Sequence, residues 1–332
     1  MFRIRNKLIF VALLGMIGGN FASAEDIKLS GFVDANYRWN SQGTLTPGFS
    51  VTDAALYFSK ELNNAKVMVD LPFSNAGATN NNFNFATTQA QAYVSYKYDN
   101  GIEWQLGQWD YIFGYEGADS ADRFFSGAGL IPTYGHFDTS TGLLVGYSFS
   151  EALMFQVYAA NPNNQGLLGS DNMDYGVKGS GKMDAFSYAL GYRTWKRKSN
   201  NVFDNTIDLV LGYNMGDTDL NFEVARHKNA VHSTTGMGYG LWATHNFDND
   251  FAWGLRGEYT EKMVHKDWAT NSTVTAADTI YRTAWQASTG PSFKLTKDLT
   301  GRADFTYYTE KRVPGVKAWV NKYATVSAVY KF

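Results

Sequence analysis

The sequence contains no cysteine, only six prolines and, after its first residues, no apolar run long enough for a helix to cross a membrane. The lack of cysteine excludes disulfides, thiol catalysis and cysteine-based metal sites. A membrane-spanning helix needs about 20 apolar residues, so helical spans are not expected. The chain also lacks a basic balance, with 29 basic residues against 31 acidic ones. This excludes the basic surface that a nucleic-acid partner requires.

The N-terminus carries the features of a secretory signal. Residues 3–7 supply three basic side chains, residues 8–17 form a short apolar segment, and residues 22–24 read Ala-Ser-Ala. This order predicts a signal peptide over residues 1–24 and a mature barrel domain over residues 25–332. An amphipathic N-terminal helix is the alternative.

Apolar and polar residues alternate along most of the chain. Because successive side chains of a strand point to opposite faces, each alternating segment predicts a strand with one apolar and one polar face. The rhythm predicts sixteen strands and an all-β fold. Their expected bounds are 27–39, 50–61, 66–73, 86–98, 102–109, 134–149, 153–161, 172–182, 185–195, 205–215, 218–228, 236–247, 251–261, 279–293, 299–309 and 321–332.

The connections between these strands alternate between short and long. Short turns, longer external loops, an even strand number and aromatic residues at strand ends are typical of a transmembrane antiparallel β-barrel of the bacterial outer membrane. A soluble β-sandwich also alternates, but its strands average about five or six residues. Many segments here have the length of a tilted span of about 10 residues. The last one ends in Phe332 and resembles the C-terminal signal that the barrel-assembly machinery recognises.

One connection, residues 110–133, breaks the rhythm for longest, between the fifth and sixth predicted strands. A structureless stretch of this length in a compact domain is usually functional or disordered. Its many aromatic residues suit packing against a wall. We therefore expect this loop to fold into the lumen and to narrow the pore. The charged residues expected at the constriction are Asp110, Glu116, Asp119, Asp122 and Arg123.

The polar positions of the strands are expected to line the lumen, and the wall opposite the long loop carries arginines. The expected basic wall consists of Arg38, Arg256, Arg282 and Arg302. An acidic loop that faces a basic wall would set a transverse field favouring hydrophilic and dipolar solutes. Two alternatives stay open. The wall charges could simply solvate a wide interior, and Arg123 could pair with loop carboxylates to hold the loop in shape.

Motifs for catalysis and cofactor binding are weak. Residues 176–183 nearly match a phosphate-binding loop, but they end in Met where a hydroxyl is needed, and a strand is predicted after them. We expect a hairpin turn there. The five histidines lack metal-ligand spacing, and no nucleophile with a positioned base stands out. The sequence therefore predicts no enzyme, no cofactor and no metal site.

Four short motifs carry a family resemblance. They read GFVDANYRWN at residues 31–40, QAYVSY at 91–96, LGQWD at 106–110 and GYE at 114–116. They resemble the OmpL-like β-barrel porin family over about the first half of the mature chain, while the second half matches in rhythm. The resemblance implies a diffusion pore of the outer membrane.

These observations together predict a sixteen-stranded outer-membrane porin for small hydrophilic solutes and ions. The alternative is a structural or surface-binding barrel with a plugged lumen. The expected partners are outer-membrane lipid and lipopolysaccharide, the assembly machinery through Phe332, and the solutes themselves. A homotrimer, as in general porins, is compatible with this prediction.

Overall fold

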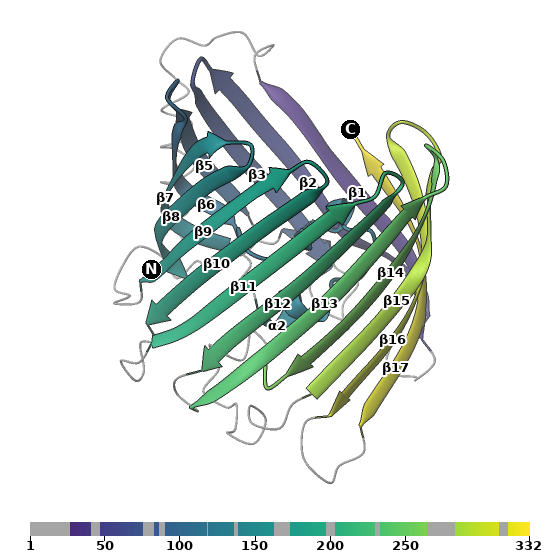
Figure 1. The fold of residues 1–332 in the computed structure, drawn as a ribbon. Helices are drawn as coiled ribbons and strands as arrows, with labels where there is room; N and C mark the ends of the chain where they lie inside the picture. Colours follow the sequence, from purple (N-terminus) through teal and green to yellow (C-terminus); the bar gives the residue numbers. More distant parts are fainter. Residues whose placement is uncertain are drawn as a thin grey trace, which may run out of the picture.

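The computed structural model describes residues 27–40, 47–75, 83–85, 90–117, 119–135, 139–162, 173–196, 203–229, 233–263, 283–311 and 318–332. These residues form one antiparallel sheet that closes on itself, so that the structure is a barrel (Figure 1). The strands are β1 (Lys28–Asn40), β2 (Gly48–Leu62), β3 (Ala65–Asn75), β4 (Phe83–Phe85), β5 (Gln91–Lys97), β6 (Ile102–Asp110), β7 (Thr139–Ser150), β8 (Leu153–Pro162), β9 (Asp174–Met183), β10 (Phe186–Lys196), β11 (Phe203–Asn214), β12 (Thr218–Asn229), β13 (Thr234–Asn246), β14 (Phe251–Glu261), β15 (Thr283–Lys294), β16 (Leu299–Lys311) and β17 (Trp319–Lys331). The helical segments are η2 (Ser120–Asp122) and α2 (Leu130–Gly135).

The seventeen strands occupy sixteen positions around the barrel. The three-residue strand β4 and the longer β5 both pair with the same neighbour, β3, so they share one position. Closure comes from the pairing of β1 with β17, which runs from Phe32 opposite Lys331 to Asn40 opposite Tyr323. Closure matters in a bilayer because no water is present there to satisfy an open sheet edge.

Alternation along each strand separates the two faces of the wall. On β14, for example, Leu255 is 55% exposed while its neighbour Arg256 is 3% exposed. The exposed positions of most strands are large and apolar, and the alternating positions are polar and covered. The wall therefore presents a lipid-compatible surface outward and a polar surface inward, as expected of a transmembrane barrel.

Most predicted strands match the structure to within two residues, and three predictions need correction. The predicted strand 86–98 is shorter in the structure, where β5 begins at Gln91 and ends at Lys97; a separate strand, β4 (Phe83–Phe85), precedes it, and residues 86–89 lie outside the described residues. The predicted strand 134–149 begins only at Thr139 among the described residues, because α2 occupies residues 134 and 135, and residues 136–138 lie outside them. Residues 176–183 lie within β9 and the hairpin turn follows them, so the turn predicted at this motif is wrong.

The short connections and the C-terminus lie at the same end of the barrel, because the strands are antiparallel and their number of positions is even. At that end the amide of Gly31 donates to the carbonyl of Phe332 at 3.0 Å, and the amide of Phe332 donates back at 3.1 Å. Short turns mark the periplasmic end of such barrels. No helix among the described residues is long and apolar enough to span a membrane.

Candidate pore site

The segment between β6 and β7, here called the β6–β7 loop (residues 111–135), contacts the covered face of strands around the barrel. It contains η2 and α2. The helix α2 lies against β12 to β15 (Figure 1), where Leu130 and Ile131 pack with Ala225, Trp242 and Ala284. The side chain of Ile131 is completely covered in this cluster.

The first part of the loop follows the wall from β8 to β12. The ring of Phe113 lies on Gly191 of β10 and packs with Tyr158 of β8. A side chain at position 191 would occupy the place of this ring. Further along, the amide of Tyr115 donates to the carboxylate of Glu223 on β12 at 3.0 Å. The wall thus holds this part of the loop through two contacts, the packing of Phe113 on Gly191 and the hydrogen bond from Tyr115 to Glu223.

Glu116 is the central anchor of the loop. Its carboxylate accepts from Nη1 of Arg256 at 2.7 Å, from Nε1 of Trp242 at 3.2 Å and from the amide of Gly129 at 2.6 Å. Burial alone would raise the pKa of Glu116, but attraction to Arg256 and Arg123 outweighs burial and lowers it. The carboxylate is therefore charged at neutral pH and fully hydrogen-bonded within the wall.

A second arginine binds the backbone of the loop. Nη1 of Arg302 on β16 donates to the carbonyls of Ser120 and Arg123 at 2.9 and 2.8 Å. Its Nη2 donates to Asp34 of β1 at 2.7 Å, which neutralises the charge. Guanidinium groups suit such a site because their donors have a fixed planar arrangement.

The middle of the loop also reaches β2. The hydroxyl of Tyr57 donates to Oδ2 of Asp119 at 2.6 Å, and the amide of Ser120 donates to Oδ2 of Asp53 at 3.0 Å. Burial and the nearby charge of Asp122 raise the pKa of Asp119, although the hydrogen bond from Tyr57 acts against this. Among the described residues, neither Asp53 nor Asp119 forms an ion pair.

The other residues predicted at the constriction have different surroundings. Asp110 is the last residue of β6, and its carboxylate accepts the amide of Tyr111 at 2.8 Å. Asp122 forms an exposed ion pair with Lys331 at 2.9 Å. Arg123 donates from Nε to the carbonyl of Gly117 at 2.8 Å, a contact within the loop.

The predicted basic wall is only partly brought together. Arg256 and Arg302 both contact the loop directly. Arg38 lies over the ring of Tyr323, with Cζ at 5.0 Å from the ring centroid. Arg282 lies outside the described residues. Because Glu116 touches Arg256, these two charges do not face each other across an open gap, as the transverse-field hypothesis requires.

Sequence reasoning missed several residues that hold the loop. They include Trp242, Asp53, Tyr57 and the wall glycines Gly191 and Gly254, the second of which lies under the ring of Phe124. A glycine at a covered position of an alternating strand is the one signal that could have pointed to these contacts. Among the described residues, no group of three or more histidine, aspartate or glutamate side chains is arranged to hold a metal ion.

The sequence matches one family model over residues 26–332, described as "Putative beta-barrel porin-2, OmpL-like". The chain belongs to this family. Family membership and the closed barrel identify an outer-membrane β-barrel porin. No curated protein matches the sequence.

Solved structures of outer-membrane channels share the fold of this porin. The channel DcaP of Acinetobacter baumannii aligns with a TM-score of 0.65 at 13% identity, over 94% of this chain and 99% of that chain. OprB of Pseudomonas putida gives 0.67 at 13% identity, over 93% and 94%. OmpF of Salmonella typhi gives 0.63 at 14% identity, over 92% and 97%. At these identities the likeness concerns the fold alone.

Proposed function

We propose that this porin is a passive diffusion channel for small hydrophilic solutes and ions, and that the β6–β7 loop narrows its lumen. The observation that carries the proposal is the path of the loop. It leaves the wall at β6 and is anchored at Arg256 on β14, eight of the sixteen positions away. The loop also contacts the covered face of β10, β12, β16 and β2. It therefore occupies part of the lumen of a barrel that is otherwise wide enough for an aqueous channel.

The charges around the loop support a preference for cations. The two arginines that hold the loop are already neutralised by carboxylates, Arg256 by Glu116 and Arg302 by Asp34. Asp53 and Asp119 form no ion pair among the described residues. Arg123 acts on both at longer range, which leaves these three side chains with a net negative charge. An excess of negative charge beside the passage concentrates cations in it. This proposal replaces the transverse field that the sequence suggested.

Planar-bilayer recording of the purified, folded protein tests the function. We expect stepwise conductance with a cation preference at neutral pH. A folded protein without conductance steps would instead support the alternative, a structural or surface-binding barrel with a plugged lumen. The proposed activity is diffusion and involves no bond chemistry and no cofactor.

The assembly of the porin is part of the same proposal. We infer that residues 1–24 are removed as a signal peptide and that Phe332 guides insertion through the assembly machinery. A homotrimer is proposed because a structure of OmpT from Vibrio cholerae, similar in fold, is described as a trimer form. Mass analysis of the mature N-terminus and of cross-linked protein from intact membranes tests both points.

A further inference from the structure

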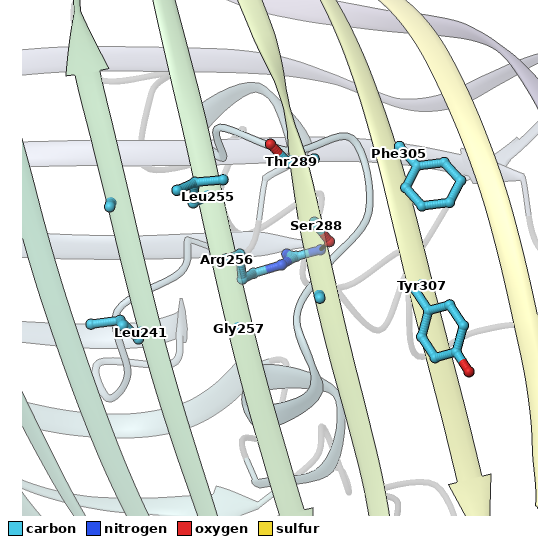
Figure 2. Close-up of a pocket in the computed structure, with 10 residues that line it drawn as sticks. Leu241, Leu255, Arg256, Gly257, Ser288, Thr289, Phe305 and Tyr307 are labelled. Atoms are coloured by element: carbon cyan, nitrogen blue, oxygen red, sulfur yellow. Dashed lines mark hydrogen bonds between the residues drawn. The ribbon is translucent and has the colours of Figure 1, made fainter.

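The lipid-facing wall of the barrel contains an apolar groove across β13 to β16 (Figure 2). Its volume is about 460 Å³, within the range of ligand-sized clefts. Gly257 and Ala287 form the floor, since they are opposite one another in the β14–β15 ladder. Leu241 and Leu255 border one side, and Figure 2 shows Phe305 and Tyr307 on the other.

The groove is deepest at Gly257 because glycine has no side chain, and packing within the wall does not require a glycine there. A Cβ added to Gly257 would meet no atom within 4 Å. Its backbone also has no left-handed conformation that would need a glycine. The open space above Gly257 therefore lies on the outer surface of the wall, where a molecule in the membrane can occupy it.

A lysine lies at the external end of the groove, next to Tyr307. Lys322 is exposed on the outward face of β17, opposite Tyr307 in the β16–β17 ladder, and its Nζ lies 5.5 Å from the centroid of the Tyr307 ring. Lys322 is three residues from the start of β17, and that end is external because the strand finishes at the periplasmic end. No carboxylate pairs with Lys322 among the described residues.

A cation on the lipid face is unfavourable unless its charge reaches the headgroup region or meets an anion. We propose that the groove binds an acyl chain of a lipopolysaccharide molecule of the external leaflet, with a lipid phosphate on Lys322. The apolar lining fits the chain, and the cation at the external rim fits a phosphate at the head of that chain. To occupy the same site, a second copy of the porin would need an apolar ridge that fits the groove and a carboxylate placed opposite Lys322.

Native mass spectrometry of delipidated full-length porin, titrated with defined lipopolysaccharide, tests the site. We expect one tightly retained molecule on the wild type. Gly257→Leu, which fills the floor, and Lys322→Gln, which removes the charge, should each weaken retention about tenfold. Gly179→Leu is the matched control, because Gly179 lies on the outward face of β9 and a Cβ there also meets nothing within 4 Å.

Several outcomes would overturn the proposal. Retention by Gly257→Leu equal to that of Gly179→Leu would exclude the groove. Dephosphorylated lipid that binds the wild type as tightly as the intact lipid would exclude the phosphate contact. A change of oligomeric state in both groove variants, with lipid retention unchanged, would assign the groove to a second copy. If Gly257→Leu fails to fold, Ala287→Leu fills the same floor from β15 and allows the same comparison.

Discussion

Glu116 shows how a single residue fixes the position of a long loop. A carboxylate removed from water must be paired and hydrogen-bonded to remain charged. Three donors from β13, β14 and the loop itself meet that condition. Because these donors come from different segments, the loop has one favoured position rather than a range of positions.

Loss of the charge on Glu116 should loosen the loop. In Glu116→Gln the amide oxygen can still accept a hydrogen bond, but Arg256 loses its main counter-charge. Arg256 then keeps Glu258, at 3.5 Å, as its counter-charge, so the cost lies below the roughly 3–5 kcal/mol of a buried ion pair broken outright. We expect trypsin to cleave after Arg123 at least tenfold faster than in the wild type. Glu61→Gln is the control, since Glu61 forms only an exposed pair with Lys28 at 3.9 Å; equal cleavage of the two variants would contradict the anchoring role.

The same contact should make the loop sensitive to acid. The pKa of Glu116 in the folded protein is below its ordinary value of 4.5, so its stabilisation is present above that value and is lost as the pH falls through the lowered pKa. The raised pKa of Asp119 has the opposite effect on stability. As the pH falls, protonation of Asp119 removes a buried charge and so does not destabilise the loop. Hydrogen exchange of peptides from 119–135, corrected for intrinsic rates, should therefore rise only below about pH 4.5. An onset near pH 6 would contradict the assignment.

At the scale of elements, the strands and the loop fit because the wall leaves gaps for loop side chains. Gly191→Ala would place a Cβ into the ring of Phe113, and the loop would have to move away from β10 into the lumen. Overpacking of this kind costs about 1–3 kcal/mol. We expect a lower single-channel conductance and faster proteolysis of the loop. Gly179→Ala should change neither, because its Cβ would point into open space; the same conductance in both variants would refute the fit.

The strands could be predicted from the sequence because their two periodic faces meet two uniform environments, lipid and lumen. The run from Phe251 to Glu261 alternates without interruption and was predicted to the residue. The loop contacts could not be predicted, since they join residues such as Glu116 and Arg256 that are far apart in sequence and follow no period. Helix α2 was missed for a related reason: Leu130 and Ile131 are fixed by packing against the wall rather than by a local pattern.

At the scale of the whole molecule, the barrel is a closed frame, and under the proposed function the loop narrows the passage through it. The frame has sixteen strand positions, and the loop is held against β2, β12, β14 and β16 of that ring. The arginines at these contacts are neutralised where they bind. The charge that a permeating ion meets therefore depends on the carboxylates that form no ion pair among the described residues.

Removal of the two carboxylates at the loop that form no ion pair among the described residues should therefore lower the cation preference of the channel. Asp53→Asn combined with Asp119→Asn keeps the shape of both side chains, and the amide of Ser120 and the hydroxyl of Tyr57 can still donate to the new amide oxygens. A unit charge about 8 Å from an ion in water contributes roughly 0.5 kcal/mol, so the loss of both should reduce the cation-to-anion permeability ratio about fivefold. Reversal potentials in a salt gradient measure this ratio.

The matched control is Asp217→Asn combined with Asp250→Asn, on exposed short turns at the periplasmic end. It removes the same charge and should leave the permeability ratio unchanged. Equal effects of the two double variants would show that overall charge, rather than the loop, sets the selectivity.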